Sequence, residues 1–159
     1  MLVGFGYDIH RLESGRPMRL GGIDIPDATS GPVAHSDGDV LLHAVCDALL
    51  GAAAIGDIGK HFPDTDQAYR GISSVELLRR VVELLAEKGY TPHNLDCMLI
   101  LERPKIAAYR DAMREEIART LGISPERVSV KATTNEGLGP IGAGEGIAAY
   151  AVATVNESE

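Results

Sequence analysis

The sequence is poor in cysteine and has no long hydrophobic run. Its two cysteines, Cys46 and Cys97, lie far apart and form no C-x-x-C pattern. Neither a disulfide framework nor a thiolate zinc site is indicated, so any bound metal is expected to use histidine and carboxylate ligands. No apolar run approaches the ~20 residues that cross a bilayer, and no charged start precedes an apolar segment with a cleavage site. We therefore expect a cytoplasmic protein with no membrane partner.

Positive charge is also scarce. The chain has 15 Lys and Arg residues and 23 Asp and Glu residues, which gives a net charge of −8. Such a chain repels phosphate backbones, and no basic stripe offsets the repulsion, so nucleic acid is not an expected partner. The length of 159 residues, with 45% apolar and 24% charged residues, predicts one folded domain over residues 1–159. Its small interior favours a site shared between subunits.

Hydropathy patterning predicts an α+β fold in which a mixed β-sheet packs against helices, in the order ββααβαββ. Strands are expected at residues 1–10, 95–101, 128–134 and 147–155, with a hairpin turning at Gly21 and Gly22. Helices are expected at residues 40–54, capped by Ser36 with Asp39 three residues on, at 73–89, and at 104–122, where Pro104 occupies the first turn. Residues 56–66 have no period and are expected to form a loop.

The first group of residues that could carry chemistry lies on the first strand. Asp8 and His10 alternate with Ile9, so both side chains project from one face and can converge on one ion. Gly4 and Gly6 precede them on that face, and glycine in a strand often marks the close approach of another backbone or a ligand. The alternative interpretation is an exposed edge on which an Asp and a His occur by chance.

His43 is the second candidate, because it lies early in an almost wholly apolar helix. A buried imidazole is costly unless it is hydrogen-bonded or bound to a metal. Asp39 and Asp47 lie four residues before and after it, so either can hold one ring nitrogen and leave the other for a metal. Asp8, His10 and His43 together would leave a fourth tetrahedral position open, which is the catalytic arrangement of zinc. The alternative is a core histidine bonded to a backbone carbonyl.

The third candidate is residues 131–137, a strand that runs into a glycine-rich loop. Threonine hydroxyls and backbone amides suit phosphate oxygens, whereas Glu136 suits them only with a Mg²⁺ ion between. The segment therefore indicates a diphosphate with a metal. It is not a P-loop, because G-x-x-x-x-G-K-[ST] is absent. The alternative is a flexible turn in which the glycines adopt left-handed backbone conformations.

Taken together, these segments resemble the 2-C-methyl-D-erythritol 2,4-cyclodiphosphate synthase family of the non-mevalonate isoprenoid pathway. The resemblance covers nearly the whole chain. It rests on GYDIHRL at residues 6–12, the long motif AHSDGDVLLHAVCDALLGAAAIGDIGKHFPDTD at 34–66, RPK at 103–105, KATTNEGLG at 131–139 and GEGIA at 144–148.

The resemblance implies a homotrimer with active sites between adjacent subunits. It also implies a phosphorus–oxygen lyase that converts 4-diphosphocytidyl-2-C-methyl-D-erythritol 2-phosphate into the 2,4-cyclodiphosphate and CMP. By resemblance, Zn²⁺ is held by Asp8, His10 and His43, and Mg²⁺ or Mn²⁺ by Glu136. The implied substrate-binding residues are His35, Ser36, Asp57, Gly59, Asp64 and Asp66 for the methylerythritol phosphate, and Lys105, Thr133 and the catalytic Thr134 for the cytidine diphosphate.

One departure from the family pattern concerns Pro140 and Ala143, where many members carry Phe and Arg. Those side chains are associated with an isoprenoid diphosphate on the trimer axis, so this chain is expected to bind such a ligand weakly or not at all. Two other functions stay open. A zinc-dependent phosphoesterase would activate metal-bound water, and a noncatalytic trimeric module would bind metal or sense isoprenoids without turnover.

Overall fold

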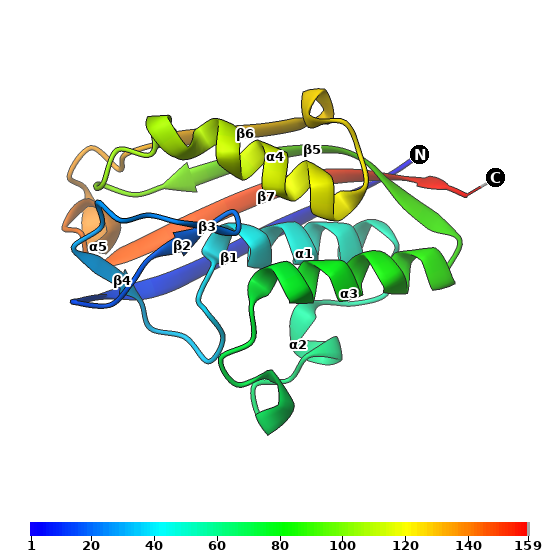
Figure 1. Ribbon diagram of the computed structural model, residues 1–159, viewed down its shortest axis with the longest axis horizontal. Helices are drawn as coiled ribbons and strands as arrows, with labels where there is room; N and C mark the ends of the chain where they lie inside the picture. Colours follow the sequence, from blue (N-terminus) through cyan, green and yellow to red (C-terminus); the bar gives the residue numbers. More distant parts are fainter. Residues whose placement is uncertain (159) are drawn as a thin grey trace.

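The computed structural model describes residues 1–158. Five strands form one mixed sheet in the order β4-β1-β7-β5-β6, and a two-stranded hairpin lies beside it (Figure 1). The strands are β1 (Leu2–Ser14), β2 (Arg19–Leu20), β3 (Ile23–Asp24), β4 (Ser30–Pro32), β5 (Tyr90–Ile100), β6 (Val128–Thr133) and β7 (Gly146–Glu157). The helices are α1 (Val40–Ala52), α2 (Ile58–His61), α3 (Ser74–Glu87), α4 (Arg110–Leu121) and α5 (Gly139–Gly142). The α+β class predicted from the sequence is confirmed.

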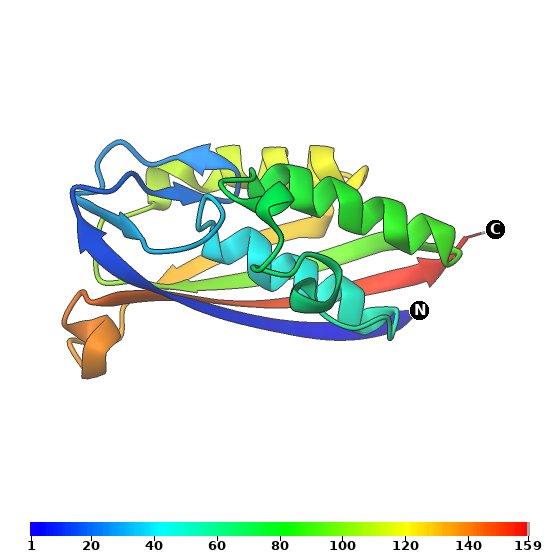
Figure 2. The same ribbon diagram turned by 90° about the horizontal axis from the view of Figure 1, so that it is seen from below.

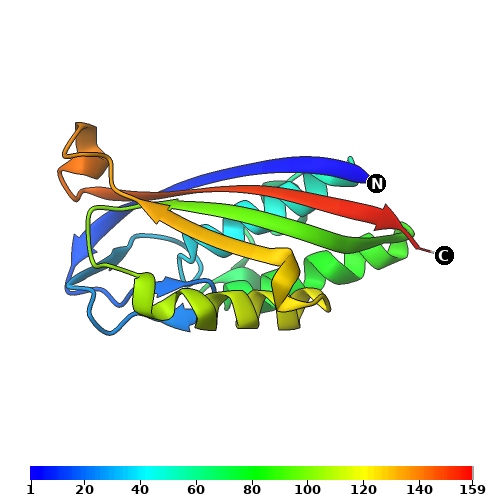
Figure 3. The same cartoon turned by 90° about the horizontal axis from the view of Figure 1, so that it is seen from above.

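The three long helices lie on one face of the sheet (Figure 2). In the sheet, β7 pairs antiparallel with both β1 and β5, whereas β5 and β6 run parallel (Figure 3). The register places Asp8 opposite Ala149 and His10 opposite Ile147. Of the helices formed by residues 1–158, none combines the length and the hydropathy that a membrane span requires.

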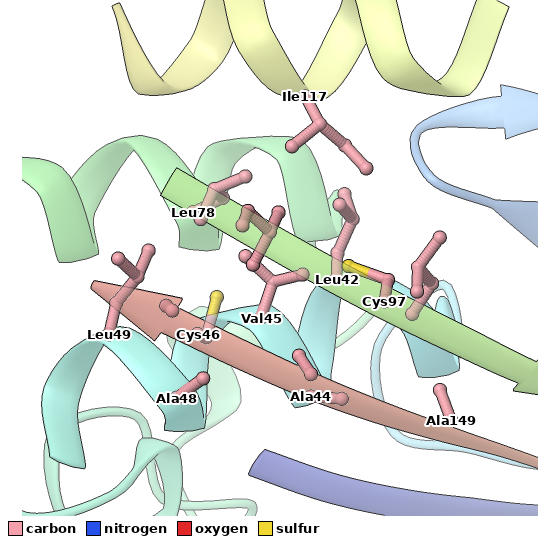
Figure 4. Close-up of a cluster of buried hydrophobic side chains, with 14 of the residues drawn as sticks. Leu42, Ala44, Val45, Cys46, Ala48, Leu49, Leu78, Cys97, Ile117 and Ala149 are labelled. Atoms are coloured by element: carbon pink, nitrogen blue, oxygen red, sulfur yellow. The ribbon is translucent and has the colours of Figure 1, made fainter. Parts of the chain in front are cut away.

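Helix α1 is the centre of the core. Leu42, Val45 and Leu49 of this helix lie among side chains of α3, α4 and β5, including Leu78 and Ile117 (Figure 4). Nearly every residue of α1 is buried, as its almost wholly apolar sequence predicts. His43 is therefore fixed in a helix that packing holds on most sides.

Two glycines set the distance between β1 and α1. A Cβ atom at Gly4 would lie 1.9 Å from the carbonyl oxygen of Ala48, and one at Gly6 would lie 1.9 Å from that of Ala44. Only glycine permits this approach, and the predicted close backbone contact is confirmed. The next residues on the same face of β1 are Asp8 and His10, which the contact brings to the first turn of α1.

The other face of β1 carries apolar side chains that the helices do not cover. Val3, Phe5, Tyr7 and Ile9 are exposed, Phe5 by 62% of its surface. Tyr150 of β7 continues this face, and its ring centroid lies 4.9 Å from that of Tyr7. Together with Val152, these side chains form an apolar surface that we call the open sheet face.

The structure corrects several predicted boundaries. The cap of α1 is Asp39 and not Ser36, because the Asp39 carboxylate accepts the Leu42 amide. Residues 56–66 are not all loop, since Asp57 caps the short helix α2. Pro104 precedes the third long helix, which begins at Arg110. The order ββααβαββ counts the β2–β3 hairpin as one strand and omits β4, α2 and α5, each of which is too short to show a period.

The remaining predicted elements are confirmed, with small shifts at their ends. Gly21 and Gly22 form the hairpin turn with φ of 59° and 78°, in the left-handed region that glycine tolerates. Helix α3 begins at Ser74, one residue after the predicted start at residue 73, and the Ser73 side chain makes no capping hydrogen bond.

Candidate functional site

Three side chains from two elements converge on one point. Asp8 Oδ2 lies 3.0 Å from His10 Nε2 and 3.0 Å from His43 Nδ1, and the two ring nitrogens lie 3.2 Å apart. Asp8 and His10 come from β1, where alternate residues share a face, and His43 comes from α1. The convergence predicted from the sequence is confirmed.

The donor set fits a zinc ion. Four ligands at about 2.1 Å from Zn²⁺ in a tetrahedron lie about 3.4 Å from one another, close to the spacing of these three atoms. Two imidazole nitrogens and one carboxylate oxygen are ligands that zinc accepts, and they leave one position free. Asp8, His10 and His43 are also the one group of this kind that could hold a metal within residues 1–158.

In the metal-free protein, hydrogen bonds and charge attraction between the Asp8 carboxylate and the two imidazoles hold the three side chains together. Burial raises the pKa of Asp8, but hydrogen bonds from His10 and His43 outweigh burial and lower this pKa to about 2. Burial lowers the pKa of His43, but the hydrogen bond and negative charge of Asp8 raise it above its usual value. Asp8 therefore stays ionised at neutral pH and is ready to bind a cation.

The second ring nitrogen of His43 contacts two serines. His43 Nε2 lies 3.0 Å from Ser74 Oγ and 3.1 Å from Ser36 Oγ. The prediction that Asp39 or Asp47 holds this nitrogen is wrong.

Both carboxylates have other partners. Asp39 accepts the amides of Gly21, Gly22 and Leu42, and Asp47 accepts the Ile58 amide at 2.8 Å. Sequence reasoning missed Ser74, since nothing in the spacing of residues 43 and 74 links the two positions.

A cavity of about 310 Å³ opens beside the three ligands. Four of the residues expected to bind methylerythritol phosphate line it: His35, Ser36, Gly59 and Asp64. Within residues 1–158, His35 Nε2 is buried without a hydrogen-bond partner, so it is available to a ligand. Phe62, Tyr69 and Ile72 add an apolar side that the sequence did not single out. We call this space the metal cavity.

Two other expected residues, Asp57 and Asp66, are not part of the lining of the metal cavity. Asp57 accepts the Lys60 amide at 2.9 Å as the cap of α2. Asp66 accepts the Ala68 amide at 2.9 Å and begins the single 3₁₀ turn at Gln67–Tyr69. Both carboxylates therefore have structural partners near the metal cavity.

A second cavity of about 190 Å³ lies at the ends of β5 and β6. Lys105, Thr133 and Thr134, which the resemblance assigns together to the cytidine diphosphate, all line this cavity. Glu136 follows in the loop, exposed and with φ of 53°, and it lines neither cavity. The second cavity, which we call the threonine cavity, shares no lining residue with the metal cavity. Pro140 and Ala143 lie farther along, at exposed positions of the segment that contains α5.

A family model described as the YgbB family matches residues 1–156. The chain belongs to the YgbB family. This YgbB-family chain is 61% identical over 155 residues to a Symbiobacterium thermophilum protein named 2-C-methyl-D-erythritol 2,4-cyclodiphosphate synthase, and the match covers 98% of both. A relative of the same name from Alkaliphilus metalliredigens is 56% identical over 158 residues, 99% of each chain.

Solved structures agree with this membership. The bifunctional IspDF from Campylobacter jejuni matches the YgbB-family chain with a TM-score of 0.94 and 40% identity, over 99% of this chain and 42% of that one. A CDP-bound 2C-methyl-D-erythritol-2,4-cyclodiphosphate synthase matches with a TM-score of 0.89 and 40% identity, over 97% of this chain and 99% of that one.

Proposed function

We propose that this chain converts 4-diphosphocytidyl-2-C-methyl-D-erythritol 2-phosphate into 2-C-methyl-D-erythritol 2,4-cyclodiphosphate and CMP, as a phosphorus–oxygen lyase. The observation that carries the proposal is the convergence of Asp8, His10 and His43 beside a cavity. It occurs in a chain whose relatives bear the name of that synthase and include a CDP-bound structure.

Two kinds of metal fit the residues. Asp8, His10 and His43 would hold Zn²⁺, and Glu136 would hold Mg²⁺ or Mn²⁺ near the diphosphate. When bound, these cations neutralise phosphate charge and make the attacked phosphorus more electrophilic, in a protein whose own net charge is −8.

The side chains position a substrate that carries its own nucleophile. An oxygen of the 2-phosphate forms a bond to the phosphorus joined to the methylerythritol, and the bond from that phosphorus to CMP breaks. No protein nucleophile is needed, because positioning and electrostatics carry most phosphoryl transfers. Tethering supplies an effective molarity of up to ~10⁵ to 10⁸ M when the groups are aligned.

We assign the two cavities to the two ends of the substrate. His35, Ser36 and the backbone at Gly59 in the metal cavity would bind the methylerythritol phosphate, with Asp57, Asp64 and Asp66 on its hydroxyls. Lys105, Thr133 and Thr134 in the threonine cavity would bind the cytidine diphosphate. Thr134 would also contact the reacting phosphates, so we place it among the catalytic residues.

A homotrimer would join these two half-sites. The metal and threonine cavities share no lining residue in one chain, and we assign one substrate to the metal cavity of one subunit and the threonine cavity of the next. The open sheet face supports association, because an apolar surface of this kind is typical of an interface. A C3 ring of three copies would bury the face and create three equal sites.

The reaction products test the proposal against the alternative phosphoesterase. Pure protein is incubated with the cytidylylated substrate, Zn²⁺ and Mg²⁺ in ¹⁸O-labelled water, and the products are read by phosphorus NMR and mass spectrometry. The proposal predicts a cyclic diphosphate and CMP without solvent oxygen. Linear phosphates that carry ¹⁸O would overturn it in favour of hydrolysis, and no turnover would favour a noncatalytic module.

A further inference from the structure

A chain of three polar groups begins at His43 and runs through Ser74 to Asp37. His43 Nε2 contacts Ser74 Oγ at 3.0 Å, and the Ser74 hydroxyl in turn donates a hydrogen bond to Asp37 Oδ1. The Ser74 amide donates to the other carboxylate oxygen, Asp37 Oδ2, at 2.9 Å. Ser74 is fully buried at the first position of α3. The backbone amide and the hydroxyl of Ser74 therefore both bind the same carboxylate, and this pair of bonds holds the hydroxyl in one place.

The direction of these hydrogen bonds follows from the groups themselves. An ionised carboxylate only accepts, so the single hydroxyl proton of Ser74 points to Asp37. Ser74 Oγ then has only lone pairs to offer His43, so the Nε2 atom of His43 must carry the hydrogen. The form of His43 that binds a metal through Nδ1 therefore keeps its hydrogen on Nε2 and has its lone pair on Nδ1, the nitrogen that faces Asp8 and His10. In the metal-free protein Nδ1 also carries a hydrogen, which it donates to Asp8.

We propose that Ser74, oriented by Asp37, is a positioning residue that fixes the tautomer and ring orientation of His43 for metal binding. This inference rests on the proposed zinc site. The partner of the second ring nitrogen of a metal-binding histidine commonly sets which nitrogen is metallated. Here that partner is a hydroxyl whose own proton is committed to a carboxylate.

Ser36 differs from Ser74 in two respects. Its Oγ lies 3.1 Å from His43 Nε2, but it also accepts the Gly38 amide at 3.2 Å, and no carboxylate of residues 1–158 orients it. Ser36 lines the metal cavity, whereas Ser74 does not. Loss of Ser74 should therefore weaken metal binding without a direct effect on substrate contacts, and loss of Ser36 should act chiefly on the substrate.

The test measures the zinc Kd of the full-length protein by competition with a chelator, without substrate. Ser74→Ala should raise the Kd by about 10- to 100-fold, the usual effect of removing such a partner. Ser73→Ala is the matched control, since its exposed side chain makes no capping bond and should leave the Kd unchanged. With zinc at saturation, the KM of Ser74→Ala should stay near that of the unchanged chain.

A second measurement needs no variant and covers the case in which Ser74→Ala fails to fold. Nitrogen-15 NMR of the zinc-loaded unchanged protein should show His43 protonated at Nε2, with that proton protected from solvent. A proton on Nδ1, or an unchanged Kd in folded Ser74→Ala, would overturn the inference alone. An unchanged chain that binds no zinc would overturn the proposed zinc site, and the inference with it.

Discussion

His43 Nδ1 lies 3.0 Å from Asp8 Oδ2, although 35 positions separate the two residues in the sequence. The contact exists because β1 lies against the backbone of α1, where Gly4 and Gly6 remove the side chains that would separate them. The geometry of the metal site is thus a consequence of how one strand packs on one helix.

Gly6→Ala tests this dependence. Its Cβ atom would meet the Ala44 carbonyl oxygen, which belongs to the backbone and cannot rotate away. We expect the free energy of unfolding to fall by about 1 to 3 kcal/mol, as overpacking does elsewhere. Zinc content should fall as well, because the strand must move from the helix. Urea unfolding and metal analysis of the purified protein measure both effects.

Gly51→Ala, in the helix α1 against which Gly6 packs, is the matched control. The nearest atom to its added Cβ is the Phe5 carbonyl oxygen at 3.9 Å, an ordinary contact. Alanine in a helix is favoured over glycine by about 0.5 to 1 kcal/mol, so this variant should be at least as stable as the unchanged chain. A Gly6→Ala protein that matched it in stability and zinc content would show that β1 and α1 are farther apart.

The Asp8–His43 pair predicts a pH dependence in the metal-free protein. The pKa of Asp8 is lowered to about 2, so its stabilising effect is full above its usual value of 3.8 and is lost as the pH falls toward 2. The pKa of His43 is raised, so its effect is full below 6.5 and is lost as the pH rises through the raised value.

The pair should therefore stabilise the metal-free fold most between about pH 4 and 6.5. Urea unfolding of the unchanged chain and of His43→Gln, both with chelator, should show the largest difference in that window and a smaller one at pH 9. A difference that grows as the pH rises would contradict the pairing.

Part of this arrangement could be predicted from the sequence, and the rest depends on tertiary contacts. Alternation places Asp8 and His10 on one face of a strand, and that inference uses only local geometry. Ser36 and Asp39 are both residue types that cap helices. Asp39 is the cap in the structure, where the amides of the Gly21–Gly22 hairpin also bind its carboxylate, and this tertiary contact is not visible in the sequence. The contact of Ser74 with His43 joins two helices and leaves no periodic signal.

The open sheet face is a similar case. The alternation of β1 correctly predicts which residues share a face, but the apolar face of the strand is the one that points away from the helices. Period alone says which residues share a face and not which face meets the core. Here the glycines decide, since only the Gly4 and Gly6 face can approach α1 so closely.

If each active site is formed by two subunits, a mixture of two inactive variants should regain part of the activity. His43→Ala damages only the metal cavity, and Lys105→Ala with Thr134→Val damages only the threonine cavity. After unfolding and refolding together in equal amounts, mixed trimers should each contain one intact site, which gives about a quarter of full activity. A mixture as inactive as its components, in protein shown to be trimeric by ultracentrifugation, would place each site within one subunit.

Pro140 and Ala143 predict that the proposed trimer binds an isoprenoid diphosphate on its axis weakly or not at all. Neither side chain carries a positive charge, so a ring of three copies would lack the cations that a diphosphate needs there. Calorimetric titration with geranyl or farnesyl diphosphate should show weak or no binding. Ala143 is exposed in one chain, and the substitution Ala143→Arg should increase the affinity for these diphosphates. Tight binding of one ligand per trimer by the unchanged protein would refute this prediction.

We expect cyclisation to depend on a zinc ion held by Asp8, His10 and His43. The most direct measurement is phosphorus NMR of the cytidylylated substrate after incubation with the unchanged protein and with His43→Ala, alongside the zinc content of each. We expect cyclic diphosphate and bound zinc for the unchanged protein, and loss of both for the variant. A zinc-free His43→Ala protein that still forms the cyclic product would show that cyclisation does not depend on this zinc.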